Sequence, residues 1–337
     1  MFCPKCGNEV QEGSAFCGNC GAGIAGKVPN TAGVATAAAT VATTKAGKKK
    51  GPIAIVAAIV AIVAVAVIGI NVFGGSGVAV KDSTEAYTWE ELSKISGEIS
   101  KARDEGAAVE IAKKYNLTTK DGKLDGTQTK SVTLTDGTQT AVQIVGFAHD
   151  EKTDGGKAGI TFIFKDCIGE HDMNSSNTNA GGWEAAQLRS YLNSEGLNLL
   201  PNDLKQAVVS VNKLTNNVGQ TQDVSSVTKT VDQIWLFSQT ELCGTISLFS
   251  GGSEAATYND VLSAEGSEYK LFRDANVDQK RANKIFLKNF NGQSKAWWMR
   301  SPMPKWESAF CNTNGSGYPN DASGSKISRG VCPGFCI

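Results

Sequence analysis

The sequence has few of the residues on which many catalytic sites depend. Its 337 residues include two histidines, His149 and His171. Neither stands in a pattern that pairs a nucleophile with a general base. The 33 basic and 33 acidic side chains leave the chain without net charge, so the overall charge implies no strongly charged partner. The composition therefore argues against an enzyme.

No charged residue occurs between Lys50 and Lys81, and the net charges on the two sides of this gap differ in sign. Residues 1–51 carry six lysines against two glutamates, a net charge of +4, and the rest of the chain carries 27 basic and 31 acidic residues, a net charge of −4. Residues 52–70 are 19 uncharged, mostly aliphatic residues, which form a helix about 28 Å long, near the thickness of the bilayer core. We therefore predict a transmembrane helix at residues 52–73.

The flanking charges predict the orientation of this helix. Lys45 and the lysines at 48–50 precede it directly, whereas the first charged residues after it are mixed in sign. Positive charges in such positions stay on the cytoplasmic side, where anionic lipid attracts them. We expect a single-pass protein of the cell membrane, with a cytoplasmic N-terminus and an extracellular C-terminal domain. The lipid bilayer is then one of its partners.

Four cysteines near the N-terminus predict a zinc ribbon at residues 1–22. Their spacing, C-x2-C-x10-C-x2-C, suits two thiolate hairpins that close a tetrahedral site around one structural Zn²⁺. The ligands are Cys3, Cys6, Cys17 and Cys20. Redox pairs or two disulfides are the alternative, and the expected cytoplasmic location disfavours them. So short a segment has no core of its own, so the metal supplies most of its folding free energy.

The ribbon lacks the features of a nucleic-acid binder. Residues 1–30 contain no arginine, and their two lysines are balanced by two glutamates. Only Phe2 and Phe16 could stack on bases. We therefore expect no nucleic acid and, at most, a cytoplasmic protein partner. Residues 23–51, rich in Ala, Gly, Thr and Val, are interpreted as a flexible linker with a basic end.

The segment beyond the predicted span has mixed secondary-structure patterns. Residues 81–118 predict two juxtamembrane helices, the first with Thr88 and Glu91 in capping-box register and the second at residues 107–115. Residues 119–337 alternate between strand and helix patterns, and the Asp136-Gly137 pair predicts a hairpin turn. The elements show no βαβ rhythm, which favours an α+β fold.

Four stretches of this second part carry a resemblance to a known family. WEAAQLRSYLN, DQIWLFSQTE, AWWMRSP and GVCPGFCI follow one another in this order. Together they resemble a bacterial domain-of-unknown-function family whose members end in a WWLRSP element and a GVRPAF-type strand. The resemblance covers about residues 85–337 and implies a C-type-lectin-like fold at residues 119–337, shared by sulfatase-modifying factors and by variable proteins of diversity-generating retroelements. A zinc ribbon with a single span is a common companion of this domain in surface proteins of Gram-positive bacteria.

The WWMRSP element itself favours a structural role. We expect Trp297 and Trp298 to be buried, and Arg300 to bind backbone carbonyls or a carboxylate. The chain departs from the family pattern at Cys332, where arginine is usual. Cys332 and Cys336 are too far apart on an extended strand to bridge each other, and either could meet Cys311. Because the predicted outside part has five cysteines, an odd number, we predict no disulfide framework.

A polar segment between the last two predicted strands, PKWESAFCNTNGSGYPNDASGSKISR, is the candidate ligand site. It combines aromatic side chains with short hydrogen-bonding ones, a composition suited to sugar or protein surfaces. The candidates are Trp306, Asn312, Asn314, Tyr318, Asn320 and Asp321. An ordinary polar surface loop is the alternative. In the retroelement relatives this region is the diversified one. The chain has no Glu-Pro-Asn or Gln-Pro-Asp triplet, so calcium is not indicated.

The sequence therefore favours a membrane-anchored protein that displays a binding surface for a glycan or a protein outside the cell. One alternative is a cell-envelope enzyme of the sulfatase-modifying-factor type, whose copper chemistry needs two suitably spaced thiols in a cleft. A second alternative is a cytoplasmic zinc-ribbon signalling or scaffold head coupled to an outside sensor domain.

Overall fold

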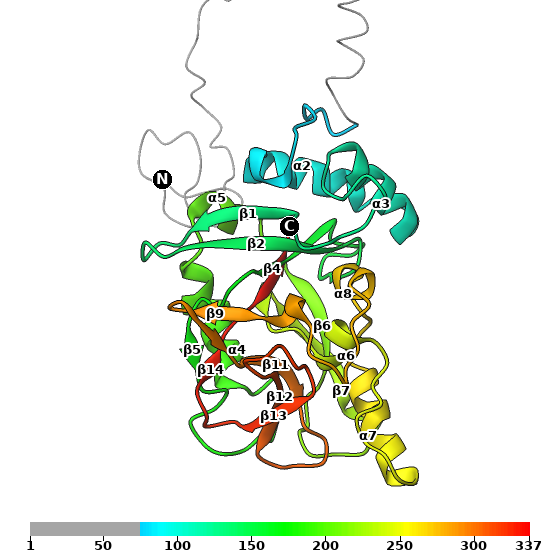
Figure 1. Ribbon diagram of the computed structural model, residues 1–337, viewed down its shortest axis with the longest axis vertical. Helices are drawn as coiled ribbons and strands as arrows, with labels where there is room; N and C mark the ends of the chain where they lie inside the picture. The colour runs from blue at the N-terminus through cyan, green and yellow to red at the C-terminus, as the bar shows by residue number, and fades with distance from the viewer. Residues whose placement is uncertain (1–74) are drawn as a thin grey trace, which may run out of the picture. The chain divides into compact units, whose positions relative to one another are not determined.

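The computed structural model describes residues 75–337 (Figure 1). The predicted zinc ribbon, linker and membrane span, including the four zinc ligands, lie outside the described residues. Among residues 75–337, no helix has both the length and the apolar character needed to cross a membrane. The predicted span at 52–73 is therefore not tested by this observation.

The two helices predicted within residues 81–118 are present as α2 (Trp89–Ile99) and α3 (Glu105–Lys114). The Thr88 side chain accepts a hydrogen bond from the Glu91 backbone N–H (3.2 Å), and the Glu91 carboxylate accepts one from the Thr88 N–H (2.8 Å), which completes the predicted capping box. The second helix begins two residues before the predicted start because Asp104 caps it.

The first sheet has the strand order β1-β2-β4-β15-β8 and is antiparallel throughout. Its strands are β1 (Thr129–Thr133), β2 (Gln139–Phe147), β4 (Ile160–Phe164), β15 (Gly334–Cys336) and β8 (Ile234–Trp235). The β1–β2 hairpin turns at Asp136-Gly137, as predicted. Helix α2 covers this sheet, because the Trp89 ring packs on Phe162 of β4 and Phe335 of β15, with centroids 5.6 and 6.2 Å apart.

The second sheet has the order β13-β12-β11-β14-β5. Its strands are β13 (Asp321–Gly324), β12 (Ala309–Thr313), β11 (Trp297–Pro302), β14 (Arg329–Gly330) and β5 (Glu170–His171). β11, the WWMRSP element, is wholly buried and pairs in parallel with β14 at Trp297 and Gly330. The polar segment between them is not one loop, however. Its Ala-Phe-Cys run is apolar enough to form the buried strand β12, which pairs with both β11 and β13.

The remaining strands form a sheet of order β3-β6-β7 and the pair β10-β9. Their bounds are β3 (Glu151–Lys152), β6 (Val211–Asn216), β7 (Val227–Asp232), β9 (Lys288–Phe290) and β10 (Gln293–Lys295). The other helices are η1 (Thr84–Ala86), α4 (Gln187–Tyr191), η2 (Leu192–Gly196), α5 (Asn202–Ala207), η3 (Val224–Ser226), α6 (Gln239–Cys243), α7 (Ser253–Ser263), α8 (Lys270–Asp274) and η4 (Lys284–Phe286). This mixture of helices and largely antiparallel strands confirms an α+β architecture.

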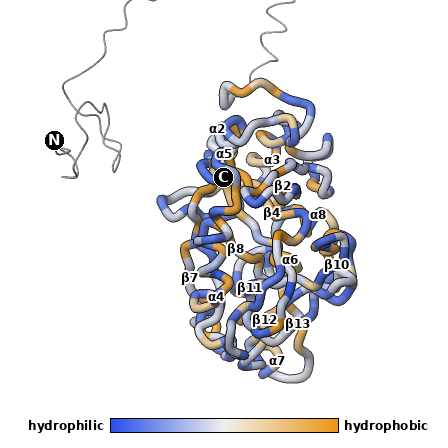
Figure 2. The backbone as a smooth tube through the Cα atoms, turned by 90° about the vertical axis from the view of Figure 1, so that its left-hand side faces the viewer, coloured by the Kyte–Doolittle hydropathy of each residue, from blue (hydrophilic) through white to orange (hydrophobic). Residues whose placement is uncertain are grey.

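The described residues form an elongated body with two distinct ends. α2 and α3, next to residue 75, lie at one end, and β12, β13 and α7 lie at the other (Figures 1 and 2). The hydrophobic core runs between these ends, and its largest fully buried side chains include Trp183, Trp235, Trp297 and Trp298. The predicted burial of the two β11 tryptophans is thus confirmed.

Candidate functional site

Arg300 on β11 is fully buried at the centre of a polar network. Its guanidinium donates to the carbonyls of Leu236 and Leu214 (both 2.9 Å) and to both carboxylate oxygens of Glu241 on α6 (2.5 and 2.9 Å). Its Nε donates to the Thr215 hydroxyl at 2.7 Å. The prediction that this arginine binds backbone carbonyls and a carboxylate is confirmed. One side chain therefore joins β11, β6, α6 and the segment after β8.

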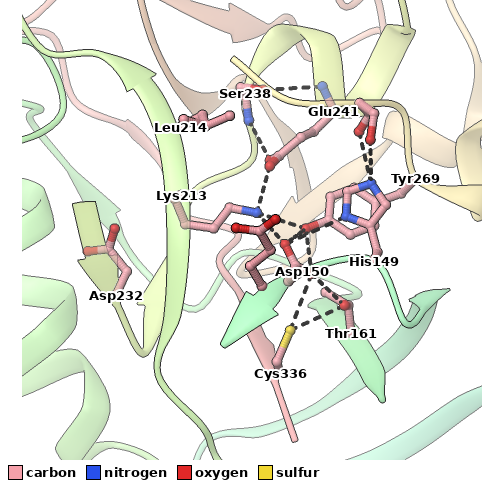
Figure 3. Close-up of polar contacts among 12 residues, drawn as sticks. His149, Asp150, Thr161, Lys213, Leu214, Asp232, Ser238, Glu241, Tyr269 and Cys336 are labelled. Atoms are coloured by element: carbon pink, nitrogen blue, oxygen red, sulfur yellow. Dashed lines mark hydrogen bonds and ion pairs between the residues drawn. The ribbon is translucent and has the colours of Figure 1, made fainter. Parts of the chain in front are cut away.

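Lys213 on β6 extends the network toward the surface (Figure 3). Its ammonium lies 2.6 Å from a carboxylate oxygen of Asp150, 2.6 Å from one of Glu241 and 2.9 Å from the Tyr269 hydroxyl. His149 stacks on the Tyr269 ring with 3.9 Å between centroids. The network thus connects β6 and β11, which belong to different sheets, with helix α6. Its four charged groups, Asp150, Lys213, Glu241 and Arg300, are at most 4% exposed.

The pKa values of the buried acids follow their partners. Burial opposes ionisation of Asp150, but the attraction of Lys213 and the contact with His149 outweigh it and hold the Asp150 pKa well below its usual range. For Glu241, burial is likewise outweighed, by Arg300 and then Lys213, so its pKa is lowered. Burial raises the pKa of Glu265 to about 7, because the opposing influences of Arg300 and the Ser301 hydroxyl are smaller.

A pocket of about 380 Å³ opens above this network, and its walls include His149, Glu151, Lys157, Lys229 and Ser267. The cations beneath it have no free donors. The three N–H groups of Lys213 face three acceptors, and each nitrogen of the Arg300 guanidinium donates to at least one acceptor. Because both cations are fully hydrogen-bonded, they stabilise the fold and neither is available to a ligand.

The cysteines of residues 75–337 do not form a reactive cleft. All five are free and buried. The Cys332 thiol donates to the Phe164 carbonyl (2.8 Å), whereas the Cys336 thiol contacts Thr161 (3.2 Å) and Asp150 (3.3 Å). Burial raises the Cys332 pKa to about 11 and the Cys336 pKa well above its ordinary value. Such thiols remain protonated and are poor metal ligands or nucleophiles.

The structure does not bring the six predicted ligand residues together in one site. Asn312 lies in β12 with no exposed surface, and its amide donates to Asp321 (3.0 Å). Its assignment to a ligand-contacting loop is therefore wrong, because β12 is covered by its neighbours. Asn314 closes the β12–β13 turn by accepting hydrogen bonds from the backbone of Ser316 and Tyr318.

Trp306 stands apart from the turn residues. It precedes β12, whereas Asn314, Tyr318 and Asn320 follow the end of that strand. A five-residue strand is about 17 Å long, so these side chains cannot contact one small ligand together. Asp321 begins β13 beside the turn. The sequence segment is continuous, but β12 separates Trp306, before the strand, from the turn residues that follow it.

Trp306 belongs instead to a cluster of three loops that are distant in the sequence. We name it the Trp306 loop cluster and define it by residues 179–182, 216–221 and 303–307. Two buried amides fasten it. Asn179 donates to the carbonyls of Met303 (3.2 Å), Trp306 (2.7 Å) and Ala309 (3.0 Å). Asn216 accepts from the backbone N–H groups of residues 218 and 219.

Further contacts lock the cluster together. The Gln220 amide donates to the Lys305 carbonyl (3.1 Å), and the Thr221 N–H donates to the Pro304 carbonyl (3.0 Å). Gly182 has a φ of +54°, and a Cβ there would lie 1.9 Å from the Asn216 carbonyl oxygen, so only glycine allows this approach. The loops are therefore held in place before any ligand arrives, which lowers the entropic cost of binding.

The exposure of Trp306 is unusual for this chain. All six tryptophans lie in the described residues, and five are at most 4% exposed, whereas Trp306 is 49% exposed. Val218, in the neighbouring loop of the cluster, is 55% exposed. The sequence analysis selected Trp306 but missed Asn179 and Asn216. The glycines at 181, 182 and 219 were the available signal, since each has a positive φ.

Comparison with known proteins identifies two segments of the chain. Residues 158–337 match the family described as "Domain of unknown function (DUF6273)", and residues 2–24 match a zinc-ribbon domain. The second match contains all four cysteines of the predicted ribbon. No curated protein and no solved structure matches the chain. Because the first match covers more than half of its length, the chain belongs to this family of unknown function and carries a zinc-ribbon domain at its N-terminal end.

Proposed function

We propose that this protein is a membrane-anchored binding protein, in which the Trp306 loop cluster contacts a glycan or a protein outside the cell. The exposed Trp306 on three rigid loops is the observation that carries this proposal. A large aromatic side chain held at the surface contributes much contact area at little entropic cost, and such residues dominate binding energy at interfaces.

The position of the cluster supports display away from the membrane. Residue 75 follows the predicted span directly, and α2 and α3 lie at its end of the folded part (Figure 1). The cluster adjoins β11 and β12 toward the opposite end. The cluster therefore lies toward the end of the folded part opposite to the residues that follow the predicted span.

The N-terminal part of the proposal concerns the cytoplasm. Cys3, Cys6, Cys17 and Cys20 are a complete thiolate set for one structural zinc ion, and the zinc-ribbon match at 2–24 supports that role. The ribbon then serves as a head for a cytoplasmic protein partner. The finer assignment of residues 119–337 to a C-type-lectin-like fold belongs to this proposal, supported by the α+β architecture and by the buried WWMRSP strand.

The test is an array of glycans and bacterial and host surface proteins, probed with the full-length protein in detergent. We expect at least one ligand whose binding is lost in Trp306→Ala. The matched control is Val231→Ala, because Val231 is also an exposed apolar side chain, 56% exposed, but lies on β7 outside the cluster. Binding that survives Trp306→Ala, or no binding to any array member, contradicts the proposal.

A further inference from the structure

A second pocket, of about 380 Å³, lies beside β5 and α4. This volume falls within the range of roughly 300–1,000 Å³ that is common for small-molecule sites. Its lining includes Glu170, His171, Asp172, Ser175, Tyr191 and Ser328. None of these residues belongs to the buried network or to the Trp306 loop cluster.

The aromatic wall of this pocket is fixed by the fold. His171 lies on β5, which pairs with β14, and Tyr191 ends α4. Their rings are 4.3 Å apart at the centroids and tilted by 38°. Gln187 on α4 accepts a hydrogen bond from the Ser175 N–H (2.7 Å), which fastens the helix to the segment after β5. The pocket therefore has a preformed shape.

Several polar groups of this pocket have no partner within the protein. Asp172, Ser175 and Ser328 are exposed to solvent, and His171 and Tyr191 are half-buried. Within residues 75–337, the Asp172 carboxylate, the hydroxyls of these serines and of Tyr191, and the ring nitrogens of His171 have no hydrogen bond or ion pair to another residue. Glu170 is paired with Lys295 at 3.1 Å. This is the reverse of the buried network, where the donors of both cations are occupied. Donors and acceptors that line a pocket without a protein partner can exchange their bound water for the polar groups of a ligand.

The combination of a carboxylate with hydroxyl groups in this pocket favours one class of ligand over others. Burial and the nearby Glu195 raise the Tyr191 pKa, so its phenol stays protonated and can donate. A simple cation could use the Asp172 carboxylate but not this donor. A sugar ring has hydroxyls that both donate and accept, and an apolar face that can lie on an aromatic ring. It could satisfy the carboxylate, the phenol and the serine hydroxyls together.

We propose that the pocket between β5 and α4 is a saccharide subsite, in which Asp172 and Tyr191 hold the hydroxyls of one pyranose ring. This inference deepens the proposed binding function by naming a ligand class, and it does not depend on Trp306. The segment 172–179 connects the pocket to the Trp306 loop cluster, because Asn174 N–H donates to the Ser325 carbonyl and Asn179 N–H to the Glu307 carbonyl.

The test is saturation-transfer NMR on the full-length protein in a detergent without a sugar headgroup. The probes are the methyl glycosides of glucose, galactose, mannose and N-acetylglucosamine, with ethanolamine as a cation probe. We expect transfer to at least one glycoside, with affinity about tenfold weaker in Asp172→Asn and about fivefold weaker in Tyr191→Phe. Asp121→Asn, an exposed aspartate between α3 and β1, is the matched control and should change nothing.

The outcomes separate this inference from the proposed function. Sugar binding that depends on Asp172 and persists in Trp306→Ala supports the subsite, even where the array finds no ligand that depends on Trp306. No transfer to any glycoside overturns the subsite, as does transfer that both pocket variants leave unchanged. Transfer to ethanolamine alone assigns the pocket to cations and also overturns it. A ligand from the array that depends on Trp306 preserves the proposed function in these last cases.

Discussion

The buried carboxyl of Glu265 should make the stability of the folded domain depend on pH near neutrality. The residue has no exposed surface, and its carboxylate accepts hydrogen bonds from the Asn216 N–H (2.9 Å) and the Ser301 hydroxyl. The buried network contains three acids, Asp150, Glu241 and Glu265, against Lys213 and Arg300. The acid in excess keeps a proton to higher pH, and burial raises the Glu265 pKa from 4.5 to about 7.

The size and sign of the effect follow from linkage. A group whose pKa is higher in the folded state than in the unfolded state contributes its full stabilisation at a pH below the unfolded pKa. It loses that contribution as the pH rises through the folded pKa. For Glu265 the unfolded pKa is 4.5 and the folded pKa is about 7. Between pH 5 and pH 8 the lost stability amounts to about 2–3 kcal/mol. Glu265→Gln keeps an acceptor for Asn216 and cannot ionise, so it should remove this dependence.

The assay is urea unfolding of the full-length protein in detergent at pH 5, 6, 7 and 8, followed by tryptophan fluorescence. All six tryptophans lie between residues 89 and 306, so the signal reports on the folded domain and not on the zinc ribbon. His149 and His171 are present in both wild type and variant, so the difference between the two curves isolates Glu265. Equal pH dependence in wild type and Glu265→Gln would refute this reasoning.

Three further predictions concern the metal, the network and the topology. The purified protein should contain one zinc ion per chain by atomic absorption. Cys3→Ser should lose this zinc without changing the midpoint of urea unfolding followed by tryptophan fluorescence, and zinc retained by the variant contradicts the four-thiolate site. Arg300→Met leaves the buried Glu241 without its main cation and should cost about 3–5 kcal/mol in the same unfolding assay, whereas a loss below about 1 kcal/mol contradicts the network's structural role. Because the cysteines of residues 75–337 are buried, labelling of intact cells with an impermeant maleimide needs an introduced thiol. Asp154→Cys, at a side chain that is 77% exposed, should react from outside the cell. A variant that reacts only after the cells are lysed contradicts the predicted orientation.

Local patterns predicted the parts of the fold that depend on neighbours in the sequence. The capping box at Thr88 and Glu91, the Asp136-Gly137 hairpin and the burial of the WWMRSP strand each involve residues a few positions apart, so a single stretch contains the whole signal. The role of Arg300 was predictable for the same reason, because an arginine inside a buried apolar strand must find acceptors.

The buried network could not be predicted in this way. Asp150, Lys213, Glu241 and Glu265 lie on separate elements, and no spacing connects them. A partial signal existed in β6, where Lys213 shares the inward phase of Val211 and Thr215. The prediction that the polar segment forms one ligand site was wrong for a different reason. Its polar composition concealed the apolar run that forms β12, and strand formation then buried Asn312 and separated Trp306 from Tyr318.

The place of β15 constrains when the domain can fold. This strand comes from residues 334–336 and yet lies inside the first sheet between β4 and β8, against α2. This interior strand is therefore synthesised after every element that packs on it. If the domain is exported as proposed, more than two hundred residues must cross the membrane before the first sheet can be completed. Contacts between residues so distant in the sequence also make folding slow, so the exported chain should depend on whatever protects unfolded polypeptide on the far side of the membrane.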